Sequence, residues 1–367
     1  MAPSPSTIAL MDCPNCSCST PAAPTEASFA APPRWPRSSP PSAPSSNSRR
    51  IACTGHVQPA IAPLSTPLRS ITMREYEDIL YETKGRLGIV TLNRPEKMNA
   101  LSHRLRAELF DAIKVAEADD DVHVVIIRGA GRTFSAGYDI TPVPNLSESD
   151  YLDYRSGLPS VGPIHPGQGQ WPQHLLSGYW QIWELAKPVI AQVHGYALAG
   201  GSELASMCDL MYVAEDAIIG YPPVRAMTTV DILYHPWHMG MRKARELCYT
   251  GDSVTGLEAV ELGWANRAFP VDQLAEETEK MGERIANIAP DMVMMSKRGL
   301  NRAYEVMGFR TALQVGADIQ SLSTFRGSAG EFGRIAQEKG LKAALDWRDG
   351  PFQDYGAAKK RPSAPTA

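Results

Sequence analysis

The order of apolar and polar residues predicts a strand, a helix and a second strand in succession. An apolar run from Leu87 to Asn93 predicts a strand that ends before Pro95. Ser102 is a candidate N-cap for a helix that continues to about Ala118, because the apolar residues after it recur at helical spacing. That stripe consists of Leu105, Leu109, Ile113 and Ala116. With a further strand at Val122 to Arg128, the segment forms a β-α-β unit, which requires a right-handed crossover.

The segment from Lys187 to Pro222 joins an apolar, β-rich run to a Gly-Gly pair and a helix-forming stretch. Glu203 lies in the first turn of that helix, three residues after Gly200, so the two share one helix face. The first N–H groups of a helix have no intrahelical partner, and paired glycines let a substrate approach them closely. The pattern therefore places an oxyanion-stabilising N–H beside a carboxylate that can move a proton. The alternative is a buried turn followed by a solvated glutamate.

A second glycine-rich segment extends from Val124 to Ile140. Its first four residues predict a buried parallel strand, which is followed by the loop Ser135 to Asp139. Glycine-rich turns after strands are common, so this loop becomes informative only together with the Gly200-Gly201 helix start.

Four motifs, in this order, resemble the crotonase superfamily, which is the enoyl-CoA hydratase/isomerase family. They are LNRPEKMNAL (Leu92 to Leu101), FSAGYDI (Phe134 to Ile140), the Gly200-Gly201 helix start and TGDSVTGLEAVELGWANRAFP (Thr250 to Pro270). The resemblance covers about Tyr76 to Phe352. It implies an α/β fold with a crotonase-type β-spiral of stacked ββα units over residues 73–272. It also implies a C-terminal helical trimerisation region over residues 273–367.

Residues 1–72 have a different composition, dominated by Pro, Ser, Ala and Thr. Such a segment buries too little apolar surface to offset its ordering entropy, so we expect disorder. Cys13, Cys16 and Cys18 form a CxxCxC cluster, but a structural zinc site usually needs four ligands, so we expect no metal. The acid-poor composition also permits an organellar transit peptide. Because Met73 directly precedes family-like sequence, an upstream misread start is the favoured interpretation.

The overall composition is typical of a soluble enzyme. The 367 residues are 43% hydrophobic and 21% charged with a net charge of −4, which allows one large domain or two small ones. No basic stripe indicates nucleic acid binding, and no apolar run approaches the roughly 18–20 residues that span a bilayer. The six cysteines do not suggest a disulfide framework. We therefore expect a cytoplasmic, reducing location, with organellar import if the N-terminal segment is genuine.

The resemblance assigns binding roles residue by residue. Its two oxyanion donors fall on the backbone N–H groups of Tyr138 and Gly200, which would hold the enolate oxygen of a CoA thioester. The phenol of Tyr138 either lines the acyl pocket or packs. The CoA-binding positions fall on Lys97, Met98, Ala100, Ser135, Ala136, Asp139 and Gly201. Phe325 and Arg348 resemble positions that touch the nucleotide end from an adjacent subunit of a trimer or hexamer, with helix packing as the alternative. No cofactor is expected apart from the CoA of the substrate.

The proton-transfer residues depart from the hydratase pattern. Hydratases carry two glutamates; Glu203 occupies the first position, but the second falls on Pro223, which has no proton to give. Asp231 matches the position of a proton-transferring aspartate in dienoyl-CoA isomerases and of a nucleophilic one in chlorobenzoyl-CoA dehalogenases. The dehalogenase histidine has no counterpart, since Trp180 falls near its place. Glu203 and Asp231 therefore resemble an acid–base pair whose pKa values separate in a semi-apolar pocket, although Asp231 can also be a helix N-cap.

Histidines and clustered aromatic residues have competing interpretations. His235 and His238 form an HxxH pair, but Pro236 interrupts it and no third ligand is apparent, so packing is favoured over a metal site or an auxiliary acid–base role. His194 is interpreted as structural. The segment between Asp139 and Lys187 is longer than in typical relatives and holds Tyr179, Trp180 and Trp183. These aromatics indicate either a bulky acyl group or packing of the following helix.

Two classes of function remain open. The first is a CoA-thioester enzyme in which Glu203 and Asp231 move protons. Syn hydration of a trans-2-enoyl-CoA is the first expectation, double-bond isomerisation the second, and hydrolysis, dehalogenation or carbon–carbon cleavage the third. The other class is a non-catalytic acyl-CoA-binding or scaffold protein. The retained Glu203 and the complete FSAGYDI loop argue against it.

Overall fold

The computed structural model describes residues 75–140, 171–323 and 326–352, and within residues 171–175 it describes only the backbone. The chain divides into two units, Met1–Ser70 and Ile71–Ala367, and the described residues belong to the second unit. The CxxCxC cluster and most of the long segment before Lys187 lie outside the described residues.

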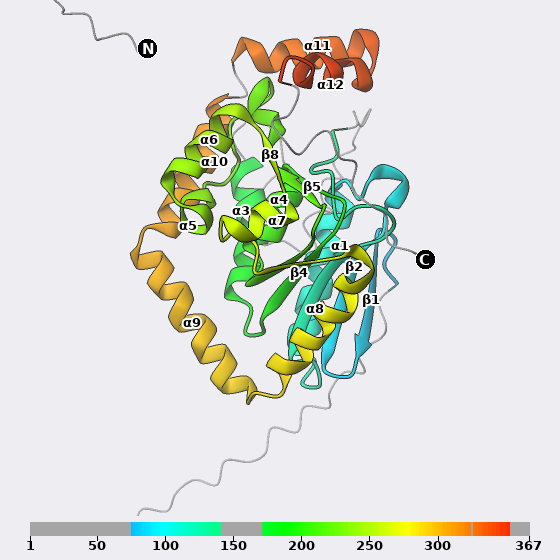
Figure 1. Ribbon diagram of the computed structural model, residues 1–367, viewed down its shortest axis with the longest axis vertical. Coiled ribbons are helices and arrows are strands. Elements are labelled where there is room, and N and C mark those ends of the chain that lie inside the picture. Colours follow the sequence, from blue (N-terminus) through cyan, green and yellow to red (C-terminus); the bar gives the residue numbers. More distant parts are fainter. Residues whose placement is uncertain (1–74, 141–170, 324–325, 353–367) are drawn as a thin grey trace, which may run out of the picture. The chain divides into compact units, whose positions relative to one another are not determined.

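Two β-sheets organise the described chain (Figure 1). The larger sheet has six strands, in the order β1 (Ile79–Lys84), β2 (Leu87–Leu92), β3 (Val124–Gly129), β4 (Val189–Val193), β6 (Leu210–Ala214) and β9 (Arg267–Phe269). The strands from β2 to β9 are parallel, and β1 pairs with β2 in antiparallel fashion. The smaller sheet consists of β5 (Tyr196–Leu198), β7 (Ile218–Gly220) and β8 (Ser253–Thr255).

The helices connect and cover these strands. They are η1 (Pro95–Lys97), α1 (His103–Ala118), α3 (Trp171–Glu184), α4 (Gly200–Met207), η3 (Pro222–Arg225), α5 (His235–Met239), α6 (Met241–Thr250), α7 (Gly256–Glu261), α8 (Val271–Ala286), α9 (Pro290–Val306), α10 (Phe309–Ser323), α11 (Gly327–Lys339) and α12 (Leu341–Asp349). No helix among the described residues is long and apolar enough to cross a membrane.

The first β-α-β unit is present as the hydrophobic pattern predicts. Strand β2 pairs in parallel with β3, and α1 lies between them in sequence. The Ser102 hydroxyl accepts a hydrogen bond of 3.0 Å from the N–H of Leu105, so Ser102 is the N-cap as predicted. Strand β3 begins two residues later than expected, because Val122 still forms a turn in which its N–H donates to Asp119 O.

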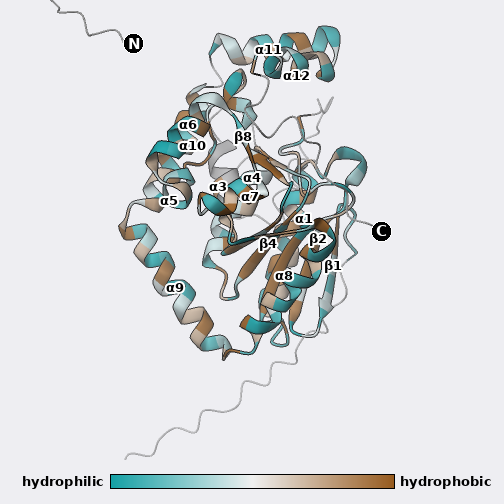
Figure 2. Ribbon diagram, in the orientation of Figure 1, coloured by the Kyte–Doolittle hydropathy of each residue, from teal (hydrophilic) through white to brown (hydrophobic). Residues whose placement is uncertain are grey.

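Helices cover both faces of the larger sheet, as a buried parallel sheet requires. Successive strand residues point to opposite faces. A Cβ added to Gly282 of α8 would lie 2.9 Å from the Leu87 side chain, whereas one added to the next strand residue, Gly88, would lie 3.5 Å from Ala116 of α1. Helices α8 and α1 therefore pack on opposite faces. All side chains of β2 and β4 are buried, and Figure 2 shows hydrophobic colour concentrated on the central strands.

The chain passes from the larger sheet to the smaller one through a tight turn that positions α4. Gly195 has a φ of 63°, and a Cβ there would lie 2.1 Å from Arg132 O, so only glycine fits. After β5, the N–H of Ala199 donates to Gly220 O of β7, which fixes the start of α4 at the end of the smaller sheet. The predicted Gly-Gly helix is thereby confirmed.

Candidate active site

Glu203 lies in the first turn of α4 and is completely buried. The preceding N-cap residue, Ala199, has a φ of 49° and a ψ of −124°, a conformation that L-residues rarely adopt. Among the described residues, the other non-glycine residues with positive φ are Met98 and Asn99, in the loop after η1. Both strained loops contain or adjoin predicted site residues. Local strain of this kind is typical of functional sites.

The FSAGYDI loop lies directly against the start of α4. A Cβ on Gly200 would lie 2.6 Å from the ring of Tyr138, and a Cβ on Gly201 would lie 2.4 Å from Ser135 O. Any side chain at either position would force the loop and the helix apart. The Gly-Gly pair is therefore required by this close approach of two backbones.

The two predicted oxyanion donors come together at this contact. Tyr138 forms a parallel bridge with Leu101, in which Leu101 N–H donates to Gly137 O and Asp139 N–H donates to Leu101 O. In such a bridge the central residue directs its own N–H to the opposite side. A Cβ on Gly137 would lie 3.4 Å from the backbone nitrogen of Gly200, which opens α4. Both donors thus belong to one small region, beside Glu203.

The Tyr138 phenol contacts the Glu203 carboxylate. The two roles expected from the sequence, lining the acyl pocket or packing, did not include this contact. The Tyr138 hydroxyl donates to Glu203 Oε2 at 2.8 Å and lies 2.7 Å from the hydroxyl of Tyr179. Tyr179, from α3, also lies 3.4 Å from Glu203 Oε2 and 3.4 Å from Gly200 O. The carboxylate is therefore held from a loop and from a helix that are far apart in sequence.

Asp231 reaches the same site from the loop between η3 and α5. It is 3% exposed, and Tyr234, not Asp231, is the N-cap residue of α5, so the capping alternative is not realised. Tyr221, which directly follows β7, interacts with the Asp231 carboxylate and favours its charged form. Within the described part of the chain, Glu203 Oε1 and Asp231 Oδ1 are buried and have no hydrogen-bond partner. Each carboxylate thus keeps one oxygen available for chemistry.

Burial perturbs both carboxyl groups, and the charge of Asp231 adds to the effect on Glu203. Burial and, secondarily, the charge of Asp231 raise the pKa of Glu203 well above its usual value, against the hydrogen bond from Tyr138. Burial also raises the pKa of Asp231, to about 7, although Tyr221 and the charge of Arg106 oppose the rise. The pair can therefore hold one proton near neutral pH, a condition for one acid and one base in the same site.

Sequence reasoning missed Arg106 and Tyr221. Arg106 belongs to α1, is 4% exposed, and its guanidinium carbon lies 5.5 Å from the centroid of the Tyr138 ring. It stands three residues before Leu109, on the buried face of the predicted helix. A cation on an apolar helix face is the signal that could have identified it, because buried arginines need a partner.

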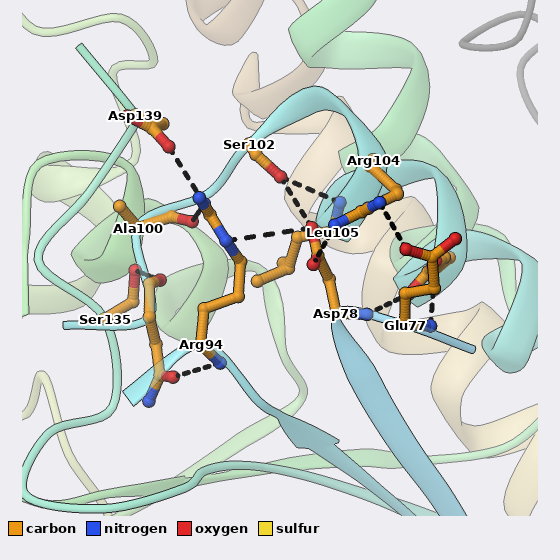
Figure 3. A network of polar contacts seen from close by, with 11 residues as sticks. Glu77, Asp78, Arg94, Ala100, Ser102, Arg104, Leu105, Ser135 and Asp139 are labelled. Carbon is orange, nitrogen blue, oxygen red and sulfur yellow. Dashed lines mark hydrogen bonds and ion pairs between the residues drawn. The ribbon is translucent and has the colours of Figure 1, made fainter. Parts of the chain in front are cut away.

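The predicted CoA-binding residues cluster in two loops that are tied together. Ala136 N–H donates to Met98 O, and the Ser135 hydroxyl donates to Asn99 O at 2.8 Å. Arg94 pairs with Asp139 at 2.9 Å and donates to Ala100 O at 2.7 Å, as Figure 3 shows. Lys97 is exposed at the end of η1. Contact of these residues with CoA stays a prediction.

Of the two C-terminal positions, only Arg348 is described by the structure. Phe325 lies outside the described residues. Arg348 is buried in α12, where it pairs with Asp349 at 2.7 Å and lies beside Met227. A nucleotide contact across subunits stays a prediction for both.

The histidines and tryptophans pack. His235 stacks on Tyr234 at 4.0 Å, and burial lowers its pKa to about 3. His194 bonds to Gly131 O. Trp183 stacks on Phe309 of α10 at 4.7 Å. In the part of the chain that the structure describes, no group of three His, Cys, Asp or Glu residues could hold a metal ion. Of the aromatic cluster in α3, Tyr179 faces the carboxylate, whereas Trp183 joins two helices.

Comparison with known proteins identifies one matching family and several named relatives. The family described as Enoyl-CoA hydratase/isomerase matches residues 82–161 and 165–350. The Mycobacterium tuberculosis protein named "Putative enoyl-CoA hydratase EchA13" is 35% identical over 306 residues, which cover 80% of this chain and 95% of that protein. A mitochondrial enoyl-CoA hydratase of Pongo abelii is 29% identical, over 80% of this chain and 95% of its own.

Solved structures give the same result for the fold. An enoyl-CoA hydratase/isomerase from Xanthobacter autotrophicus Py2 matches with a TM-score of 0.67 and 33% identity, over 76% of this chain and 99% of that one. An enoyl-CoA hydratase from Mycobacterium smegmatis matches with a TM-score of 0.68 and 30% identity, over 77% and 96%.

Proposed function

The chain belongs to the enoyl-CoA hydratase/isomerase family of enzymes, and from this premise we propose that it adds water syn to the double bond of a trans-2-enoyl-CoA thioester. The observation that carries the proposal is the carboxylate pair. Glu203 and Asp231 are both buried beside the junction of Tyr138 with Gly200, and each keeps one oxygen without a hydrogen-bond partner among the described residues.

The backbone at this junction would stabilise the charge that develops on the substrate. We place the thioester oxygen between the N–H groups of Tyr138 and Gly200. Addition to Cβ moves electrons onto that oxygen, and donors aimed at it bind the resulting enolate more strongly than the ground state. The start of α4 adds positive potential at the same point.

The two carboxyl groups would divide the proton transfers. Asp231, as the carboxylate, removes a proton from water while the oxygen forms a bond with Cβ and the carbon–carbon π bond breaks. Glu203, in its protonated form, then donates its proton to Cα. The product has gained one water, and a proton passed from Asp231 to Glu203 restores the starting state. Burial raises the pKa of both groups, so one of them can hold a proton at neutral pH, and we assign that proton to Glu203.

The same pair also fits double-bond isomerisation, which is the second candidate. Pro223 occupies the position of the second hydratase glutamate, and it lies buried in η3 without a titratable group. A site that has exchanged this glutamate for Asp231 can move a proton between two carbons of the acyl chain instead of activating water.

Mass spectrometry distinguishes these reactions. The full chain is incubated with straight, branched and aromatic enoyl-CoA thioesters in heavy-oxygen water, and in parallel in deuterated water. Gain of one labelled water at Cβ supports the hydratase. Deuterium uptake or a shifted double bond without added water indicates the isomerase, and release of the free acid indicates a hydrolase. Silence across all thioesters would favour a non-catalytic acyl-CoA-binding protein.

We further propose the β-spiral arrangement and a homotrimer or hexamer, which are finer features of this family. Helices α9 and α10 support assembly because they expose apolar side chains on their outer faces: Met292, Met295, Leu300, Val315, Ile319 and Leu322. Native mass spectrometry of the full chain tests the number of subunits. We also propose that no cofactor beyond the substrate's CoA takes part and that the protein works in the cytoplasm, which cell fractionation would test.

A further inference from the structure

The hydroxyls of Tyr138 and Tyr179 form a directed chain that ends on Glu203. A phenol carries one proton. Tyr138 donates its proton to Glu203 Oε2 at 2.8 Å, so the 2.7 Å bond between the two phenols must be donated by Tyr179. The contacts of Tyr179 with Oε2 and with Gly200 O, both 3.4 Å, are longer and weaker. The order is therefore Tyr179 to Tyr138 to Glu203.

Packing keeps this chain in place. The Tyr138 ring lies against Gly200 so closely that a Cβ there would approach it to 2.6 Å, and the guanidinium of Arg106 lies 5.5 Å from the centre of the same ring. Tyr179 is only 3% exposed within α3. The Tyr138 phenol therefore cannot leave Oε2 without disturbing the contact with Gly200, and burial holds Tyr179 beside it.

The two oxygens of Glu203 therefore have different surroundings. Oε2 receives the phenol chain, whereas Oε1 is buried without a hydrogen-bond partner among the described residues. We propose that Tyr138 and Tyr179 are positioning residues that hold Glu203 by Oε2 and make Oε1 the oxygen that exchanges a proton. The identity of the proton's destination, Cα of an enoyl thioester, rests on the proposed function, but the hold on Oε2 does not.

A donated hydrogen bond favours the ionised carboxylate, so the phenols act against the other groups around Glu203. Burial and the charge of Asp231 raise the pKa of Glu203, whereas the bond from Tyr138, the nearby backbone N–H of Ile232 and the contact with Tyr179 lower it. The remaining charged or titratable groups that face this cluster are Arg106 from α1, Tyr221 before η3 and Tyr234 before α5. Removing the hydroxyls of Tyr138 and Tyr179 should therefore raise the pKa of Glu203 further.

The test is a pH titration of the Glu203 carboxyl by infrared difference spectroscopy, with the spectrum of Glu203→Gln in the same background subtracted. Tyr138→Phe keeps the backbone N–H and removes only the hydroxyl. We expect it to raise the pKa of Glu203 by about one unit or more, which corresponds to a hydrogen bond to a charged group. Tyr179→Phe removes the second link and should cause a smaller rise. The rise in the pKa of Glu203 in the double variant should not exceed the sum of the two single rises, because both hydroxyls act through one chain of hydrogen bonds.

Tyr234→Phe is the matched control. Tyr234 is a fully buried phenol whose charge interacts with Glu203, but its hydroxyl bonds to Ser202 Oγ at 3.3 Å. Its loss should leave the pKa of Glu203 unchanged. Replacement of Tyr138 by 3-fluorotyrosine keeps the shape but strengthens the donor, so it should lower the pKa of Glu203. This opposite shift gives a test even if Tyr138→Phe folds poorly.

The outcomes separate this inference from the proposed reaction. An unchanged pKa of Glu203 in a folded Tyr138→Phe, or the same rise in Tyr234→Phe, would overturn the positioning role while leaving hydration intact. The expected shifts in a protein that turns over no enoyl-CoA would sustain the positioning role and remove the proposed function. If the positioning role and the proposed reaction both hold, the alkaline limb of the pH profile of kcat should move to higher pH in Tyr138→Phe, with a smaller change in KM.

Discussion

Two clusters of carboxylates contact the FSAGYDI loop, and their partners differ. Around Arg94, Asp139 is paired at 2.9 Å, and Asp78 accepts bonds from Arg104 at 2.8 Å and from Ser102 at 3.0 Å (Figure 3). At the start of α4, Glu203 instead lies close enough to Asp231 to sense its charge, and a phenol is its hydrogen-bond donor.

The difference shows how one fold uses the same side chain for two purposes. A carboxylate paired with a guanidinium stays ionised and fixes a loop, because the charge is compensated. Two buried carboxylates that share one site do not both ionise at neutral pH, so a proton is kept where a reaction can use it. Arg106 is an intermediate case, since its charge acts on Asp231 while its guanidinium lies over the ring of Tyr138.

The largest expected effect comes from removing the acid of the uncompensated pair. Glu203→Gln keeps the shape and the hydrogen bond from Tyr138 but has no proton to transfer. We expect kcat to fall by about 10³-fold, within the range of general acid–base catalysis. Binding of a saturated acyl-CoA, measured by calorimetry, should change little. Near-normal turnover of an enoyl-CoA would remove Glu203 from the mechanism.

Asp231→Asn should cost less, about 10²-fold in kcat, because water can be partly activated without it. The pKa of Asp231 is raised to about 7, and a base must be ionised, so wild-type activity should rise with pH through about 7. The asparagine variant should lose this acidic limb. Asp139→Asn, in the compensated cluster, is the control and should retain it. An unaltered pH profile in Asp231→Asn would make Asp231 structural.

Arg94→Met breaks the compensated cluster and should act on stability. It removes the 2.9 Å ion pair with Asp139 and the 3.7 Å ion pair with Asp78, which keeps its bond from Arg104, and it releases Ala100 O. The Arg94 side chain is 16% exposed, so we expect the free energy of unfolding to fall by about 2 kcal/mol, which lies between the values for surface and buried ion pairs. Urea denaturation measures it. In a cycle with Asp139→Asn the two losses should not add, and full additivity would contradict the pairing.

The smallest expected effect is the pH dependence of stability in Glu203→Gln. The folded-state pKa of Glu203 lies above its unfolded value, so its contribution to stability is present below the unfolded pKa of about 4.3 and declines as pH rises toward the folded pKa. Glutamine has no such decline. The advantage of Glu203→Gln over the wild type should therefore grow by at most about 1.4 kcal/mol from pH 6 to pH 7. Thermal unfolding at both pH values measures this, and a constant difference would show that Glu203 is not perturbed.

Local patterns in the sequence predicted the parts of the fold that depend on neighbouring residues. The apolar run of β2, the stripe of α1 with Ser102 as its cap, and the Gly-Gly start of α4 follow from periodicity, capping and the space that glycine leaves. Asp231 was identified through resemblance to a family, and the structure brings it to Glu203.

The sequence by itself determined the family, the order of the elements and the placement of Glu203 in the first turn of a helix, because these depend on residues close together along the chain. Only the tertiary structure decided what surrounds that carboxylate. Tyr138 lies 65 residues from Glu203 in sequence, and Tyr179 lies 24 residues away on another helix. A side chain's direction across such separations is set by how sheets and helices pack, and that packing turned one predicted acid into a pair held by phenols.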